Sequence, residues 1–120
     1  MTNRDKDIIL HIIRYCDNVA EDIREFGDTF EDFEAKRSFR DSVSMNILQI
    51  GELSHNLSEE FRESTKQNVP WKDIYNMRNH FAHGYELMDN KIIWEVAAVE
   101  VPALKKFCEE QINASDQEKS

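Results

Sequence analysis

Residues 5–26 read DKDIILHIIRYCDNVAEDIREF, a stretch in which apolar side chains recur three or four positions apart. This spacing places them on one face of an α-helix. The apolar residues are Ile9, Ile12, Ile13, Cys16, Val19, Ile23 and Phe26. Gly27 follows directly, and glycine commonly ends a helix. The stretch therefore predicts one long amphipathic helix whose apolar face is turned toward a core.

A second long helix is predicted between Phe39 and Leu57, where apolar residues repeat the same spacing. Gly51 lies inside it. Glycine within a helix costs roughly 1 kcal/mol relative to alanine, so we expect another helix to approach closely at this point. Residues 28–35, DTFEDFEA, are interpreted as an acidic link between the two helices.

A third helix is predicted to begin at Pro70, because proline is favoured at the first helical position. It should run to Ala82 or His83, with Gly84 as its end. The preceding residues 57–69, LSEEFRESTKQNV, are interpreted as a short turn of helix and a loop.

A fourth helix can be capped by Asp89 or Asn90, and Pro102 should introduce a kink in it. Its inward-facing residues are expected to be Ile92, Ile93, Val96, Val99, Leu104, Phe107 and Cys108. The sequence thus predicts an all-α fold, a bundle of four to five helices.

The length of 120 residues is enough for one modest core, which predicts a single domain over residues 1–113 and a disordered tail over 114–120. No apolar stretch reaches membrane-spanning length, and the start MTNRDKD lacks the apolar stretch of a signal peptide. We therefore expect a cytoplasmic protein without a membrane partner. Cys16 and Cys108 occupy apolar helical positions without CxxC spacing, so we interpret both as small buried side chains.

The net charge of −9 is unevenly distributed along the chain. Residues 1–34 hold ten acidic and four basic side chains and residues 84–120 hold eight and four, whereas residues 35–83 hold six and seven. An acidic protein is not drawn to nucleic acid by its overall charge. Any contact with RNA must therefore be local or built from more than one chain.

Residues 78–85 read RNHFAHGY and place two of the four histidines of the chain within eight positions. On the third helix, Ile74, Met77 and Phe81 form an apolar stripe, with Trp71 near its edge. The opposite stripe consists of Asn76, Asn79, His80 and His83. An ordinary solvated face would carry lysine and glutamate, whereas amides and imidazoles can donate, accept or exchange protons. This stripe is therefore a candidate functional face.

Arg78 and His83 are five residues apart, so on a regular helix their side chains point roughly 140° apart. They can converge only if the helix loosens near Gly84 or if a second copy of the chain brings its own pair across an interface. The spacing favours an open helix end or a cleft between two protomers.

The run from Gly51 to Trp94, GELSHNLSEEFRESTKQNVPWKDIYNMRNHFAHGYELMDNKIIW, resembles the HepT-like branch of the HEPN superfamily. The central element of the resemblance is an arginine, four residues, a histidine, one residue and a tyrosine. Arg78, His83 and Tyr85 match it, with the usual polar residue at Asn79. Lesser matches are the Gly51–Glu52 pair, the Pro70–Trp71 helix start and Trp94, and a weaker resemblance extends over nearly the whole chain.

The resemblance implies a compact helical homodimer with a ribonuclease site where two copies of the motif face each other. Such proteins act as toxins of toxin–antitoxin systems beside an MntA-like nucleotidyltransferase antitoxin, which attaches AMP to the tyrosine of the motif. Arg78 and His83 would then be catalytic, and Tyr85 would be the residue modified by AMP. Asn79 and His80 would be auxiliary residues that orient substrate or water.

This chemistry needs neither metal nor cofactor, because RNA supplies its own nucleophile, the 2′-hydroxyl. Two alternatives remain open from the sequence. His80-x-x-His83 and Glu52-x-x-His55 have the spacing of metal ligands on a helix, but carboxylate-bridged bundles need two Glu-x-x-His motifs and the chain has one. The stronger rival is a non-catalytic helical partner that binds and positions a nucleotidyltransferase.

Overall fold

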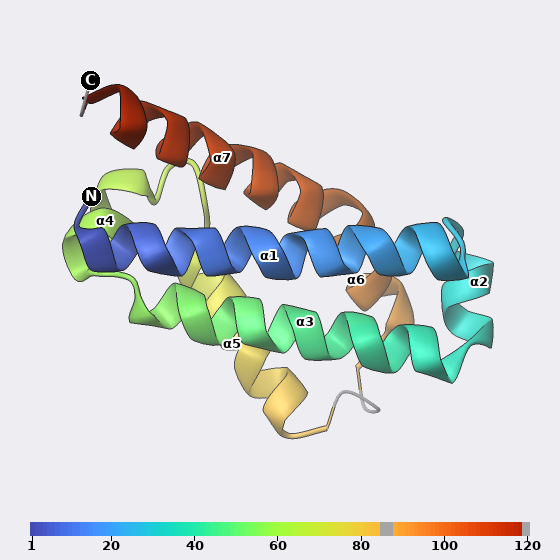
Figure 1. Cartoon of the computed structure of the whole chain (residues 1–120). Helices are drawn as coiled ribbons and strands as arrows, with labels where there is room; N and C mark the ends of the chain where they lie inside the picture. Colours follow the sequence, from blue (N-terminus) through green and yellow to red (C-terminus); the bar gives the residue numbers. More distant parts are fainter. Residues whose placement is uncertain (85–87, 119–120) are drawn as a thin grey trace.

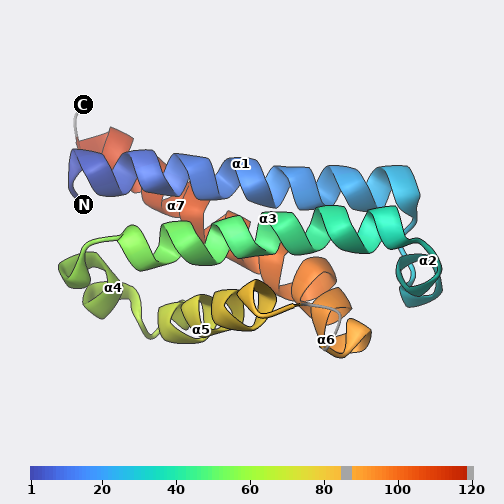
Figure 2. The same ribbon diagram turned by 90° about the horizontal axis from the view of Figure 1, so that it is seen from below.

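The structure is a computed structural model in which residues 1–84 and 88–118 are described. These residues form helices joined by turns, with no β-strand among them. Two long helices, α1 (Asn3–Phe26) and α3 (Arg37–Asn56), lie side by side and antiparallel (Figures 1 and 2). They set the long dimension of a molecule that measures 48 × 27 × 20 Å. Both long helices predicted from the sequence are confirmed.

Helix α1 is held at both ends by local hydrogen bonds. The Thr2 side chain accepts a hydrogen bond from the Asp5 backbone N–H, and Gly27, with φ of 133°, donates its N–H to the Ile23 carbonyl. At that φ a side chain would be strained, which explains why glycine ends the helix here.

The predicted acidic link is wrong, because residues within it form a short helix, α2 (Phe30–Ala35). Thr29 caps this helix by accepting a hydrogen bond from the Asp32 backbone N–H, and acidic residues in the first turn suit the positive end of the helix. The fully buried Phe33 ring packs edge-on against Phe39 and lies 5.4 Å from the Trp94 ring. A single buried aromatic residue thus anchors a helix too short to show periodicity.

Helices α4 (Glu59–Thr65) and α5 (Trp71–Ala82) follow α3. The short helix, the start of the third predicted helix beside Pro70 and its end before Gly84 are all confirmed. Helix α5 crosses α3 (Figure 1) and lies on the side of α3 away from α1 (Figure 2). This crossing positions the candidate site.

The last part of the chain comprises α6 (Asn90–Glu95), a π-helical turn η2 (Val96–Glu100) and α7 (Val101–Glu118), which packs against α1. Asp89 caps α6 by accepting a hydrogen bond from the Lys91 backbone N–H. The wide turn ends at Glu100, two residues before Pro102, which has no N–H to donate, so the expected irregularity near this proline takes the form of a π-turn.

Two expectations for this last segment are corrected. Ile92 and Val99 are 50% and 65% exposed rather than inward-facing. The π-turn widens the helix and shifts its register, so Val99 leaves the apolar stripe. Residues 114–118 are not a loose tail, because α7 continues through Glu118 and Lys6 Nζ lies 2.6 Å from Asp116 Oδ1; residues 119 and 120 of the predicted tail lie outside the described residues.

The core lies between α1, α3, α5 and the last helical segment, and it contains both cysteines. Its fully buried residues include Ile9, Ile12, Cys16, Val19, Phe33, Phe39, Val43, Leu57, Ile93 and Cys108. Burial raises the pKa of the Cys16 thiol to about 12, and burial also raises the pKa of Cys108. Both thiols are free and stay protonated at neutral pH, as expected of small buried side chains. No helix in the described part of the chain is long and apolar enough to cross a membrane.

Candidate active site

Helix α5 presents the two faces predicted from the sequence. Trp71 and Phe81 are buried, and Ile74 and Met77 pack against the core. The other stripe faces outward: Asn76, His80 and His83 are exposed and Asn79 is partly exposed. The polar stripe is thus available to a ligand rather than buried in the fold.

The crossing of α5 over α3 occurs at Gly51, as expected from its place inside the second helix. A Cβ atom at Gly51 would lie 2.6 Å from the Arg78 Cβ and 3.1 Å from the Ile74 carbonyl oxygen. Real Cβ atoms essentially never come within 3.0 Å of another atom, so the shorter of these two distances shows that glycine permits this packing. The close approach places the base of the Arg78 side chain directly on α3.

The Arg78 side chain is held by three neighbours. Its Nε donates to Glu52 Oε2 at 2.5 Å, its Nη1 donates to Asn79 Oδ1 at 3.0 Å, and its guanidinium carbon lies 5.8 Å from the centre of the Tyr75 ring. A guanidinium has five N–H groups, and Glu52 and Asn79 are the acceptors for it within the described residues. The remaining donors can bind an anion, and 31% of the side chain is exposed.

Glu52 joins the candidate site through its contact with Arg78, which the sequence does not predict. In the sequence it stands out as half of the Gly51–Glu52 pair and as the first residue of the Glu52-x-x-His55 metal-ligand spacing, and neither pattern by itself predicts a contact with Arg78. Its position next to Gly51 could have predicted this contact. Where two helices cross at a glycine, the residues beside that glycine lie close to the second helix.

His55, one turn after Glu52 on α3, stacks on Tyr75 of α5 with ring centres 4.0 Å apart and planes 17° apart. Glu52 and His55 therefore face Arg78 and Tyr75 rather than a common metal position. Within the described residues, no three His, Cys, Asp or Glu side chains come together in a way that could hold a metal ion.

His83 lies at the point where α5 ends. Its backbone N–H is shared between the carbonyls of Asn79 and His80, each 3.3 Å away, and Gly84 turns the chain away with φ of 113°. Its imidazole is exposed, one turn beyond that of His80. Arg78 instead points toward α3, so convergence of Arg78 with His83 across a dimer stays a prediction. Tyr85, the residue expected to carry AMP, lies outside the described residues.

Comparison with known families identifies the chain. The family model described as Ribonuclease HepT-like matches residues 16–111, which include all of α3, α4 and α5. The chain belongs to the HepT-like ribonuclease family. The match contains Glu52, Arg78, Asn79, His80 and His83 of this HepT-like protein.

Several proteins resemble this HepT-like chain over most of their length. A protein of Caldanaerobacter subterraneus subsp. tengcongensis, named as a candidate RNase, is 36% identical over 83% of this chain and 87% of its own. A protein of Methanocaldococcus jannaschii with a similar name is 30% identical over 91% and 98%. One from Thermococcus cleftensis, named as a probable ribonuclease HepT, is 28% identical over 88% and 93%. No solved structure shows significant similarity to the chain.

Proposed function

We propose that this HepT-like protein is a metal-independent endoribonuclease whose active site is composed at a homodimer interface. One observation carries the proposal: Arg78 is fixed by Glu52 and Asn79 with donors left over, on the same helix that ends in exposed His80 and His83. Cleavage of RNA by its own 2′-hydroxyl requires a positioned positive charge, which a guanidinium supplies, and groups that accept and donate a proton, which imidazoles supply.

The reaction forms a bond from the 2′-oxygen to phosphorus and breaks the bond from phosphorus to the 5′-oxygen. One imidazole accepts the proton of the 2′-hydroxyl, and another donates a proton to the departing 5′-oxygen. Arg78 donates hydrogen bonds to the oxygens of the phosphorane, where negative charge develops. Asn79 and His80 orient the substrate.

Two protomers are needed because Arg78 and His83 leave α5 in different directions. Arg78 turns toward α3, whereas His83 lies exposed at the helix end. An isologous dimer places the same surface of each copy opposite the other and so supplies two copies of each residue to one cleft. The homodimer is therefore part of the proposal.

The proposed role in the cell is that of the toxin of a toxin–antitoxin pair. The MntA-like nucleotidyltransferase antitoxin transfers AMP from ATP to the Tyr85 hydroxyl and releases pyrophosphate. The added phosphodiester follows His83 by two residues and brings negative charge and bulk to the cleft, where it opposes binding of the RNA backbone. A test is to incubate the protein and the nucleotidyltransferase with ATP and magnesium. AMP on Tyr85 should abolish RNA cleavage, and the Tyr85→Phe protein should stay active and unmodified.

The decisive experiment for catalysis uses purified protein, RNA and excess EDTA. Arg78→Ala and His83→Ala should each abolish cleavage, while His11→Ala, which removes an exposed imidazole from α1, should not. Circular dichroism should show the same helix content in all variants. Full activity in the Arg78 or His83 variant, or loss of wild-type activity with the chelator, contradicts the proposal. Inactive wild-type protein that binds the nucleotidyltransferase would favour the non-catalytic partner instead.

A further inference from the structure

A cavity of about 510 Å³ lies between the end of α3, helix α4 and the start of α5. Its volume falls in the range of pockets that hold small organic ligands. Tyr75 lines it, and the Arg78 guanidinium contacts the same Tyr75 ring at 5.8 Å. Tyr75 therefore lies between the cavity and Arg78 of the candidate active site, and the functions assigned above leave the cavity unused.

Aromatic side chains from two helices face this cavity. His55 of α3 and Tyr75 of α5 form the stacked pair described above, and both line the cavity together with Trp71. His55 is exposed, so a ligand in the cavity can reach the edge or face of this aromatic pair from solvent. Nucleobases stack on such side chains whatever their identity.

The rim of the cavity is more basic than the rest of this acidic protein. Arg62, Lys66 and Lys72 line it against the carboxylates of Glu59 and Glu63. Lys66 Nζ lies 2.9 Å from Glu63 Oε2, but both side chains are more than 60% exposed, and such surface pairs are weak. Lys72 is exposed and has no ion pair among the described residues. A phosphate group in the cavity can therefore bind both Lys66 and Lys72.

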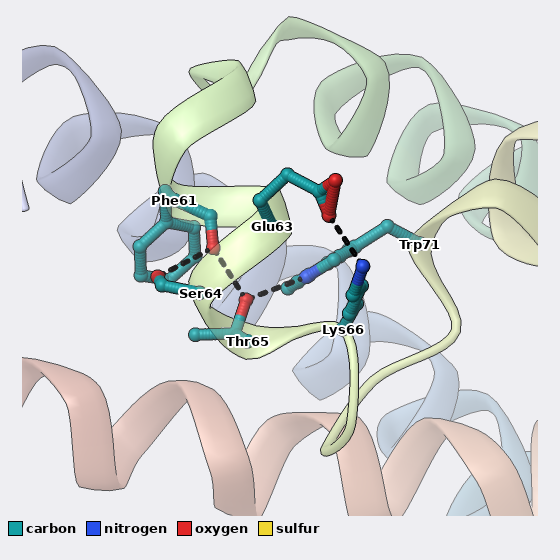
Figure 3. A network of polar contacts seen from close by, with 6 residues as sticks. All are labelled: Phe61, Glu63, Ser64, Thr65, Lys66 and Trp71. Carbon is teal, nitrogen blue, oxygen red and sulfur yellow. Dashed lines mark hydrogen bonds and ion pairs between the residues drawn. The ribbon is translucent and has the colours of Figure 1, made fainter.

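Hydrogen bonds within the protein hold the Trp71 wall of the cavity in place (Figure 3). The buried Trp71 indole donates to Thr65 Oγ1 at 2.8 Å, and this hydroxyl donates to the Phe61 carbonyl oxygen at 2.7 Å. The hydrogen bonds fix the Trp71 ring against α4, with Lys66 on the turn that follows. A preformed wall lowers the entropy lost on binding.

We propose that this cavity is a subsite of the ribonuclease that holds a nucleotide of single-stranded RNA next to the cleaved bond. The base lies against the His55–Tyr75 stack, and the phosphate lies between Lys66 and Lys72. This inference rests on the proposed function. Lys72, Tyr75 and Arg78 follow one another at intervals of three residues, so Lys72 lies roughly 9 Å from Arg78 along the axis of α5. RNA must be single-stranded here, because only unpaired bases can leave their own stack.

The first test measures RNA binding without cleavage, in protein that carries His83→Ala. Fluorescence anisotropy with a labelled single-stranded RNA gives the Kd at several salt concentrations. Adding Lys72→Glu should raise the Kd about fivefold or more and make the slope of log Kd against log salt shallower by about 0.7, the contribution of one phosphate. Lys106→Glu, the same charge reversal at an exposed residue of α7 outside the cavity, should leave the slope unchanged.

The second test addresses the stack. His55→Ala should raise the Kd for single-stranded RNA about fivefold or more, and His55→Phe should restore it, because an aromatic ring suffices for stacking. Duplex RNA of the same sequence should bind equally to both variants. In protein that retains His83, Lys72→Glu should lower the ratio of kcat/KM for a long RNA to kcat/KM for a dinucleotide. The fraction of active molecules cancels in this ratio.

The outcomes separate the subsite from the proposed function. If Lys72→Glu binds RNA as Lys106→Glu does, the subsite is wrong. If it instead weakens binding of the nucleotidyltransferase and leaves the RNA Kd unchanged, the cavity docks a protein and the subsite is also wrong. Failure of the wild-type protein to cleave RNA overturns the proposed function. The Kd measurements test the subsite independently, because they do not require cleavage.

Discussion

Arg78 is the residue on which the candidate site depends. Its base packs on Gly51, its guanidinium donates to Glu52 and Asn79, and its plane lies beside Tyr75. A lysine could not reproduce this arrangement, because an ammonium group lacks the planar fork of donors. The ion pair with Glu52 is partly exposed, with side-chain exposures of 31% and 42%, so we assign it a positioning role rather than a large contribution to stability.

The positioning role of Glu52 leads to the first prediction. Glu52→Gln should lower kcat for RNA cleavage on the order of tenfold, since the guanidinium loses its charged anchor and its orientation. KM should not rise, because the change removes a negative charge near the substrate. Asp41→Asn, which removes an exposed carboxylate elsewhere on α3, serves as the control. Equal kcat values in the two variants would rule out the positioning role.

The polar residues of the site could be predicted from the sequence, but their partners could not. Asn79, His80 and His83 share one face of α5, which helical spacing alone reveals. The Arg78–Glu52 contact joins residues 26 positions apart on two helices. Such contacts depend on where and at what angle the helices cross, and periodicity carries no information about either.

At the scale of elements, the crossing of α3 and α5 is decided by Gly51. The sequence predicted a close approach there, and the Cβ position 2.6 Å from Arg78 Cβ confirms it. Alanine would gain about 1 kcal/mol in helix propensity but would force the two helices apart, which typically costs about 1–3 kcal/mol. The second effect should dominate.

Gly51→Ala should therefore lower both stability and activity. We expect the free energy of unfolding to fall by about 1 kcal/mol in urea titration and kcat to fall at least as much as in Glu52→Gln, because the whole Arg78 side chain shifts. A more stable protein with unchanged kcat would mean that the helices do not meet at this glycine.

A buried carboxylate joins the start of α1 to the start of α4. Asp5 accepts hydrogen bonds from the Ser58 backbone N–H at 2.8 Å and the Ser58 hydroxyl at 2.6 Å. Burial acts to raise the pKa of Asp5, but the hydrogen bonds from Ser58 and Thr2 outweigh it, so its pKa is lowered. A lowered pKa in the folded state stabilises the fold above the unfolded pKa of about 3.9 and loses this effect as pH falls further.

Asp5→Asn should accordingly destabilise the protein by about 1–2 kcal/mol at pH 7, the typical cost of weakening charged hydrogen bonds. The difference from wild type should shrink as urea unfolding is repeated at pH values further below about 4, since Asp5 is protonated first in the unfolded state and, at lower pH, in the folded state. A difference that stays constant or grows in acid would show that the Asp5 charge is not what stabilises this junction.

Element prediction succeeded where helices are long and failed where they are short or irregular. Helices α1, α3 and α5 each show several turns of apolar spacing. Helix α2 has six residues and one fully buried side chain, too few for a period to appear. The π-turn η2 shifts the apolar stripe, which is why Val99 was assigned to the wrong face.

At the scale of the whole molecule, the charge distribution and the proposed dimer belong together. A chain of net charge −9 repels RNA over much of its surface, and residues 35–83 form its least acidic part. These residues contain α3, α4 and most of α5. A dimer that brings two such regions together would concentrate the few available cations in one cleft.

Mixing experiments can test whether the site is shared between protomers. Wild-type protein should be unfolded and refolded with a ninefold excess of the Arg78→Ala/His83→Ala chain, so that subunits combine at random. A composite site predicts that activity per wild-type chain falls to about a tenth, because most wild-type chains then lack a competent partner. Undiminished activity would place a complete site within one protomer, and monomers in light scattering would exclude the dimer.

The central claim, cleavage of RNA by its own 2′-hydroxyl with protons moved by histidine, is tested most directly by the ends of the products. A defined RNA should be cut by wild-type protein in excess EDTA, and the new ends should be analysed by mass spectrometry. We predict a 2′,3′-cyclic phosphate on one fragment and a 5′-hydroxyl on the other, since the 2′-oxygen replaces the 5′-oxygen on phosphorus. A 3′-hydroxyl with a 5′-phosphate, or cleavage that continues when the nucleotide at the cut carries a 2′-deoxyribose, would contradict the mechanism.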